Sequence, residues 1–177
     1  TTGHSQGIMP AMLASEGLAP TLLVERACVM ARYLLWQGIH MQMAWGRTSS
    51  DYAPMLAITG QTRDEALALT DDLEVTLSLT NAPRRFVFSG VPADLARLLD
   101  RVRNRSEAEH DAFAEGKRAR PRPLGVEWLG VSAPFHSRAM TPAVAPLQEI
   151  AKRLNVWPDP HGLKVPFLRG ETGSKWR

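Results

Sequence analysis

Gly3-His4-Ser5-Gln6-Gly7 is the most informative segment for the fold class, because it matches the pattern G-x-S-x-G and precedes an apolar helix predicted over residues 8–14. In such an elbow a serine occupies a strained turn between a strand and a helix, and small flanking residues let the two approach closely. The helix directs its N–H groups toward the reacting oxygen, so the Gln6 N–H would be one oxyanion donor, worth about 3–4 kcal/mol. The alternative is a chance glycine-rich turn, and the apolar helix favours the elbow.

A serine hydroxyl is a poor nucleophile at neutral pH, so an elbow serine requires a base. His136 lies in Ser132-Ala133-Pro134-Phe135-His136-Ser137, after a predicted strand and before a predicted helix, where catalytic groups tend to be found. Among the remaining histidines, His4 is next to the serine and His40 lies at a helix end. His110 lies in a charged loop and His161 in a proline-rich turn. The sequence therefore predicts Ser5 as the nucleophile and His136 as its base.

The composition is that of a soluble globular chain, with 177 residues of which 44% are hydrophobic and 22% charged. The net charge of +3 allows anionic partners but does not argue for nucleic acid, and segment 117–123 is better explained as a solvated basic loop because no aromatic residues interleave it. One cysteine excludes an internal disulfide and fits a reducing compartment. There is no apolar run of membrane-spanning length and no signal peptide, so we expect a cytoplasmic protein.

The spacing of hydrophobic residues differs between two regions of the chain. After a helix over 20–40 and a linker over 46–52, strands are predicted at 55–59, 75–79, 85–89 and 126–131, and helices at 62–69 and 92–102. The turn Asn81-Ala82-Pro83 joins the second and third strands, and 103–123 is expected to be a charged loop. The order βαββαβ is that of a ferredoxin-like unit. We therefore predict a ferredoxin-like subdomain over 53–131, inserted in a partial core formed by 1–52 and 132–177.

The remaining segments predict a helix over 142–154, a strand over 164–168 and a turn over 170–173. The chain starts without methionine and reaches the elbow after two residues, although the elbow needs a strand before it. We therefore expect an internal piece of a longer polypeptide.

Three motifs together resemble a known family. They are Gly3-His4-Ser5-Gln6-Gly7, the stretch from Leu77-Ser78-Leu79 through Asn81-Ala82-Pro83 to Ser89-Gly90-Val91-Pro92, and Ser132-Ala133-Pro134-Phe135-His136-Ser137. They look like the acyltransferase domains of fatty acid and polyketide synthases. The glutamine after the serine, the Pro-Phe-His-Ser form and the closing Val165-Pro166, Gly173 and Trp176-Arg177 resemble the starter acetyltransferase domain of type I fatty acid synthases of fungi and actinobacteria.

The resemblance implies an α/β hydrolase-like acyltransferase core with an inserted ferredoxin-like subdomain. It implies a Ser5–His136 dyad that takes acetyl from acetyl-CoA, forms an acetyl-serine and passes the acetyl to the phosphopantetheine thiol of an acyl carrier protein. No permanently bound cofactor or metal is implied. The implied partners are the carrier protein and the other domains of a synthase that is a homo-oligomer, with no nucleic acid and no membrane.

The resemblance also assigns substrate contacts to Ala31, Phe135 and Asn81. Malonyl-selecting members carry an arginine after the elbow that pairs with the substrate carboxylate, and Ala31 falls at that position. An apolar residue there would leave a carboxylate unpaired, which predicts an uncharged short acyl group. An alignment shifted by one residue would instead place Arg32 at the position of this arginine. The resemblance puts a second oxyanion donor and the carbonyl that orients the histidine outside this chain.

Three alternatives remain open. One is a malonyl/palmitoyl transferase of the same type of synthase. Another is a serine hydrolase, which normally places an Asp or Glu behind its histidine, although no acidic residue here has a persuasive context for that role. The third is a structural piece of a multienzyme without transfer activity.

Overall fold

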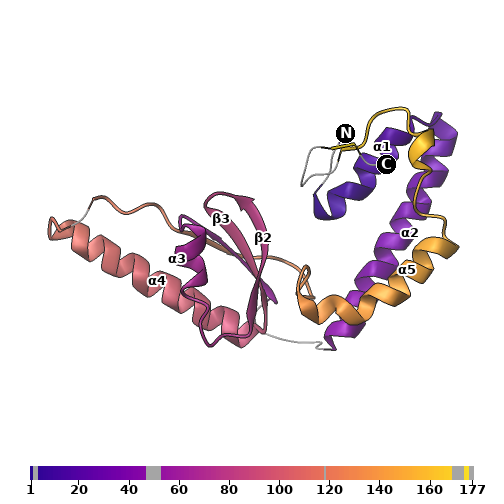
Figure 1. Cartoon of the computed structure of the whole chain (residues 1–177). Helices are drawn as coiled ribbons and strands as arrows, with labels where there is room; N and C mark the ends of the chain where they lie inside the picture. The colour runs from indigo at the N-terminus through magenta and orange to yellow at the C-terminus, as the bar shows by residue number, and fades with distance from the viewer. Residues whose placement is uncertain (2–3, 47–52, 118, 169–173, 176–177) are drawn as a thin grey trace. The chain divides into compact units, whose positions relative to one another are not determined.

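The computed structural model describes residues 1, 4–46, 53–117, 119–168 and 174–175 (Figure 1). The chain divides into two compact units, one formed by Thr1–His40 with Ala143–Arg177 and the other by Met41–Pro142. The predicted linker over 46–52, beyond Gly46, and the predicted turn over 170–173 lie outside the described residues. None of the described helices combines the length and the apolar character needed to cross a membrane.

The Met41–Pro142 unit holds an antiparallel sheet with helices on one side. Its strands lie in the order β2-β3-β1-β4. Its elements, in chain order, are β1 (Met55–Thr59), α3 (Arg63–Leu67), β2 (Val75–Ala82), β3 (Arg85–Gly90), α4 (Pro92–Ala114) and β4 (Gly125–Trp128). The predicted order of strands and helices in this region is confirmed. Since β2 continues to Ala82, the hairpin turn falls at Pro83 and Arg84 and shares only Pro83 with the predicted turn.

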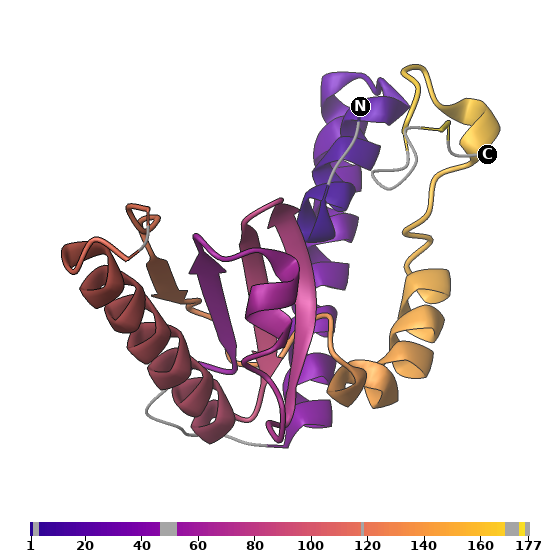
Figure 2. The same cartoon turned by 60° about the vertical axis from the view of Figure 1, so that its left-hand side comes forward.

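Each face of this sheet carries its own apolar cluster, because successive side chains of a strand point to opposite faces. Phe86 and Phe88 of β3 face α4, which runs along the sheet (Figure 2), and together with Leu95 and Leu98 they belong to the larger cluster. The opposite face carries a smaller cluster, whose buried members are Met55, Ala57 and Val87. Leu79, Leu129, Val131 and Phe135 pack against that smaller cluster. The segment that follows β4 therefore covers the face of the sheet opposite α4.

The prediction of a charged loop over 103–123 is wrong for its first half, because α4 continues to Ala114. Charged residues of good helix propensity fill this stretch, and Arg105 pairs with Glu109 one turn later at 3.3 Å. The helix ends where Gly116 adopts a φ of +72°. Lys117 N–H donates to the Ala112 carbonyl and Gly116 N–H to that of Phe113, which is the Schellman arrangement.

The other unit is built mainly from helices. They are η1 (Ser5–Gly7), α1 (Ile8–Glu16), α2 (Pro20–Trp45, which runs past His40), α5 (Val144–Arg153) and η3 (Pro160–Gly162). The helix predicted over 142–154 begins as the short η2 (Arg138–Ala143) and becomes α5 at Val144. Arg26 of α2 pairs with Glu16 at 3.0 Å and donates to the Val156 carbonyl at 2.6 Å, which ties α1, α2 and the segment after α5 together.

Helix α2 differs from its prediction in length and in its buried face. It extends five residues past the predicted end at His40, because no glycine or proline lies between His40 and Gly46, whose φ is +66°. Met30 and Tyr33 are buried, whereas the apolar residues Leu22 and Leu35 are 53% and 65% exposed. Apolar residues are spread widely around this helix, so their spacing does not reveal which side will be covered.

The strand predicted over 164–168 is wrong as a regular element, since the described residues there form only an isolated bridge between Leu168 and Lys175. The segment nevertheless pairs with the first residue. The Thr1 amino group donates to the Pro166 carbonyl at 2.6 Å, and Leu168 N–H donates to the Thr1 carbonyl at 2.8 Å. Two bonds in this pattern are those of a parallel strand pair.

Candidate active site

At the described residues of the predicted elbow, from His4 onward, the backbone turns sharply from an extended conformation into a helix; Thr2 lies outside the described residues. Thr1 is paired in the parallel manner just described, and His4 is extended, with φ −122° and ψ 132°. Ser5 then adopts a φ of +54°, after which η1 and α1 follow without a break. Gly3 lies outside the described residues. The backbone change from extended to left-handed to helical at His4 and Ser5 is the geometry that an elbow requires.

Gln6 lies in the first turn of this helical segment, where N–H groups have no partner within the helix. Gly7 N–H donates to the His4 carbonyl at 2.9 Å, and no side chain caps the start of either η1 or α1. The Gln6 side chain is exposed and Ser5 is half-buried. The turn therefore combines a serine with the N-terminal end of a helix, where backbone donors and the helix dipole favour negative charge.

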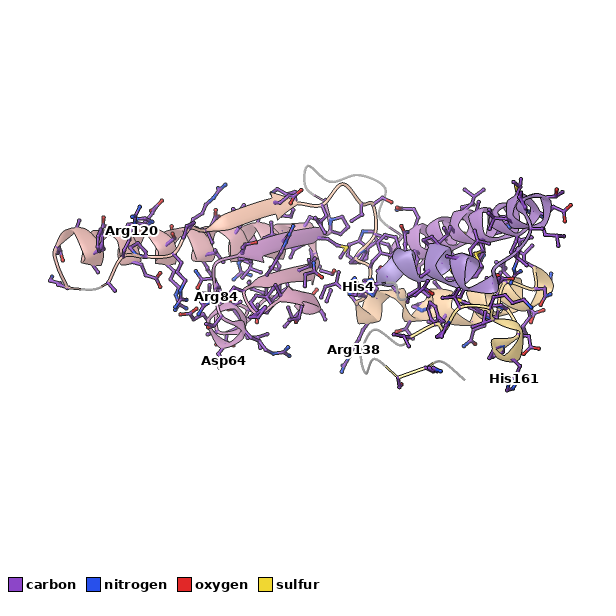
Figure 3. The ribbon with its side chains drawn as sticks, turned by 90° about the horizontal axis from the view of Figure 1, so that it is seen from above. His4, Asp64, Arg84, Arg120, Arg138 and His161 are labelled. Carbon is purple, nitrogen blue, oxygen red and sulfur yellow. The ribbon has the colours of Figure 1, made fainter. Side chains whose placement is uncertain are left out.

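His136 lies in a short loop that the described structure fixes by several hydrogen bonds. The Ser137 hydroxyl donates to the Pro134 carbonyl at 2.6 Å, and Phe135 N–H donates to the Ala133 carbonyl at 2.9 Å. The Ser89 hydroxyl, on β3, donates to the Phe135 carbonyl at 2.9 Å. His136 is exposed, and the neighbouring Arg138 extends away from the ribbon (Figure 3). The loop thus presents an imidazole on a backbone that is tied to the sheet.

Ser5 and His136 share an uncommon backbone conformation. In the part of the chain that the structure describes, positive φ occurs at four non-glycine residues, and two of them are Ser5 at +54° and His136 at +58°. The other two are Asp72 and Asn155, whose short polar side chains tolerate this region best. Strained backbone of this kind clusters at active sites. The two residues chosen from sequence as nucleophile and base are therefore set apart by backbone geometry as well.

The residues expected to contact substrate are placed at three different points. Ala31 is exposed on α2, as is its neighbour Arg32. Phe135 is half-buried against the smaller apolar cluster, on the face of the sheet opposite α4. Asn81 is exposed near the end of β2, next to the hairpin turn, whereas Ser89 and the loop that it holds lie at the other end of β3. The sheet therefore does not bring Asn81 to the His136 loop.

Other candidate groups from the sequence have ordinary surroundings. His161 on η3 is exposed and points outward, and Arg120 is exposed in the segment between α4 and β4 (Figure 3). His110 is exposed on α4, which at that point is helix and not loop.

Sequence reasoning missed Ser89, although a signal for it was present. Ser89 ends the apolar run Phe86-Val87-Phe88 and has no exposed surface. Because a buried hydroxyl needs a hydrogen-bond partner, a serine on the inner face of an apolar strand indicates a specific contact. The partner of that contact, the Phe135 carbonyl, could not be predicted from spacing alone.

Comparison with known proteins identifies the class of fold. No family model matches the chain. Among solved structures, it resembles the malonyl-CoA:acyl carrier protein transacylase of Xanthomonas oryzae, with 22% identity and a TM-score of 0.67 over 99% of this chain and 48% of that one. It also resembles the acyltransferase domain of an iterative polyketide synthase of enediyne biosynthesis, with 22% identity and a TM-score of 0.61 over 99% of this chain and 38% of that one. The fold is that of acyltransferase domains.

Curated sequences narrow the class further. The chain is 27% identical over 198 residues to a fatty acid synthase beta subunit of Emericella nidulans, and 27% identical over 199 residues to the fatty acid synthase subunit beta of Schizosaccharomyces pombe. The alignments cover 100% and 99% of this chain but 9% of each relative. The chain is homologous to the beta subunits of fungal fatty acid synthases and spans about a tenth of their length.

Proposed function

We propose that this chain belongs to an acyltransferase that loads an acetyl starter unit from CoA onto an acyl carrier protein, with Ser5 as the nucleophile and His136 as the base. The observation that carries this proposal is the left-handed backbone at both residues, each inside the motif that the family resemblance marks. The homology to fatty acid synthase beta subunits and the acyltransferase fold support it.

The chemistry proceeds in two matched halves. The Ser5 hydroxyl attacks the thioester carbonyl carbon of acetyl-CoA as its proton passes to the His136 imidazole. The carbon–sulfur bond then breaks, the CoA sulfur takes the proton from His136, and an acetyl ester remains on Ser5. In the second half, the phosphopantetheine thiol of the carrier gives its proton to His136 and attacks this ester. The Ser5 oxygen leaves and takes the proton back.

Each tetrahedral intermediate places negative charge on the former carbonyl oxygen. The Gln6 N–H, in the uncapped first turn after Ser5, is our proposed donor to this oxygen. One such donor contributes roughly 3–4 kcal/mol to the transition state. These steps use acetyl-CoA and the carrier thiol as substrates and need no permanently bound cofactor.

The domain arrangement follows the same proposal. The βαββαβ unit, with its strand order β2-β3-β1-β4, supports a ferredoxin-like subdomain over 53–131 inserted in an α/β hydrolase-like core over 1–52 and 132–177. The parallel pairing of Thr1 with the segment at Phe167 supports the core assignment.

Acetyl, rather than malonyl, is the proposed substrate because Ala31 stands where malonyl-selecting members carry arginine. A malonyl carboxylate would lack its bidentate partner there. The alternative of a malonyl/palmitoyl transferase rests on Arg32, one residue along α2 and about 100° around the helix. Phe135 and Asn81 remain proposed substrate contacts, with Asn81 the weaker of the two because it lies away from the His136 loop.

The proposed partners are the acyl carrier protein and the other domains of a homo-oligomeric, cytoplasmic fatty acid synthase. The mild positive net charge of +3 is compatible with an acidic carrier and with the CoA phosphates.

The test uses the full-length protein with radiolabelled acetyl-CoA or malonyl-CoA and then with carrier protein. We expect acetyl label on the protein, chased onto the carrier, and none after Ser5→Ala. Label from malonyl-CoA alone would overturn the acetyl assignment, and label that survives Ser5→Ala would overturn the serine mechanism. Turnover of p-nitrophenyl esters much faster than carrier acylation would favour a hydrolase.

A further inference from the structure

We propose that Ser89 is a positioning residue for His136, which fixes the imidazole through the backbone carbonyl of Phe135. This inference rests on the proposed function, because it assumes that His136 is the base. It concerns a residue on the sheet that makes no contact with the reacting atoms.

The contact joins a rigid element to the residue directly before His136. Ser89 lies on β3, between β2 and β1, and is 0% exposed. Its hydroxyl donates to the Phe135 carbonyl at 2.9 Å, across 46 residues of sequence. Phe135 and His136 share a peptide bond, so the position of the Phe135 carbonyl sets where the His136 backbone begins.

The Phe135 side chain strengthens this attachment. Val87 and Ser89 point to the same face of the sheet, and Phe135 packs against the cluster of Met55, Ala57 and Val87 on that face. Upstream, Leu129 N–H donates to the Met55 carbonyl at 3.1 Å. The loop is thus held to β1 at its start and to β3 at Phe135, immediately before the left-handed turn at His136.

Loss of the Ser89 hydroxyl would leave the part-buried Phe135 carbonyl without this donor, so the peptide is expected to rotate. A rotation here moves His136, because its φ of +58° is held by its surroundings and not by its own preference. A displacement of a catalytic group by about 1 Å can cost on the order of a hundredfold in rate. A structural role alone would lower stability without this specific loss.

The experiment compares four variants of the full-length protein: Ser89→Ala, Ser89→Cys, Ser89→Thr and Ser78→Ala. Cysteine keeps nearly the same volume but donates weakly, and threonine keeps the hydroxyl. Ser78, on the adjacent strand β2, donates to the nearby Thr76 carbonyl at 3.2 Å and serves as the matched control. The readouts are the rate constant of Ser5 acylation at saturating acetyl-CoA, the half-saturating concentration, and the rate of His136 modification by diethylpyrocarbonate.

We expect Ser89→Ala and Ser89→Cys to lower the saturating acylation rate constant on the order of tenfold to a hundredfold. The half-saturating concentration should stay unchanged, Ser89→Thr should recover most of the rate, and Ser78→Ala should match the wild type. If Ser89→Ala does not fold, Ser89→Cys decides the question. A wild-type rate constant in the cysteine variant, or a threonine variant no faster than the cysteine variant, would overturn the inference.

The two proposals fail separately. Absence of acyl-Ser5 in the wild type counts against the proposed function. The His136 modification rate then still tests the positioning role, which is overturned if that rate is the same in the wild type and in Ser89→Cys.

Discussion

Arg105 of α4 and Glu65 of α3 form an ion pair, with Arg105 Nη2 3.3 Å from Glu65 Oε1. The same Glu65 carboxylate accepts a hydrogen bond from Thr62 N–H at 2.6 Å, and the Thr62 hydroxyl accepts one from Glu65 N–H. The capping box that starts α3 is therefore held by the part of α4 that the sequence assigned to a loop. Both helices cover the same face of the sheet.

Glu65 should make stability depend on acid pH. The Thr62 backbone hydrogen bond and the charge of Arg105 hold the pKa of Glu65 below its ordinary value. A lowered folded-state pKa means that the stabilisation is present above the unfolded value of roughly 4.3 and is lost as pH falls through the folded value. We expect Glu65→Gln to flatten the fall in unfolding free energy below about pH 4.3. Urea titrations across pH test this, with the exposed Glu107→Gln as control, and an unchanged slope would contradict it.

Gly90 should tolerate no side chain. A Cβ there would lie 2.3 Å from the Glu74 carbonyl oxygen and 2.9 Å from Val75 Cα, both backbone atoms of the neighbouring chain segment. Gly90→Ala should therefore push β2 from β3 and cost about 1–3 kcal/mol of unfolding free energy. Gly130→Ala is the control, since a Cβ at Gly130 meets nothing within 4 Å. Equal denaturation midpoints for the two variants would show that the strands do not approach this closely.

Substrate choice should follow Ala31 and not Arg32. Ala31→Arg supplies a guanidinium for a malonyl carboxylate, so we expect acylation from malonyl-CoA to appear and acetyl loading to fall at least tenfold, or about 1.4 kcal/mol. Arg32→Ala should leave acetyl loading unchanged. Competition between the two labelled acyl-CoA substrates measures this preference. If the wild type used malonyl-CoA and Arg32→Ala lost that use, the residue that selects the substrate would be Arg32 and not Ala31.

Ser5 should make the folded protein less stable than a glycine at the same position would. A left-handed φ costs a non-glycine residue about 1–2 kcal/mol, and glycine loses about 0.5–1 kcal/mol through the unfolded chain. Ser5→Gly should therefore raise the unfolding free energy by roughly 0.5–1 kcal/mol while it removes acylation. Ser78→Gly in β2 should instead lower the unfolding free energy by a similar amount. Denaturant unfolding of the 177-residue chain compares them, and a less stable Ser5→Gly would argue against strain at the elbow.

The fold was most predictable where local signals and tertiary contacts agree. The apolar run at β1 and the Thr62–Glu65 capping pattern specify their elements directly. The second half of α4 was missed because its charged residues indicate solvent exposure but not whether the backbone is helical. Its cap at Gly116 was the available signal. The buried side of α2 was not predictable, since apolar residues are spread widely around that helix.

The site was predictable as a set of residue types and not as a set of contacts. The elbow pattern and the Pro-Phe-His-Ser context singled out Ser5 and His136, whose left-handed backbone the structure then revealed. The Ser89–Phe135 contact joins residues 46 positions apart and depends on strand pairing that no local pattern specifies.

Peptide mapping can establish whether Ser5 carries the acyl group with His136 as its base. The full-length protein is mixed briefly with acetyl-CoA, quenched, digested and examined by mass spectrometry, alongside His136→Ala and the exposed-histidine control His161→Ala. We expect an acetyl group on the Ser5 peptide in the wild type and in His161→Ala, and little or none in His136→Ala. Acetylation at another residue, or equal acetylation of Ser5 in His136→Ala, would contradict it.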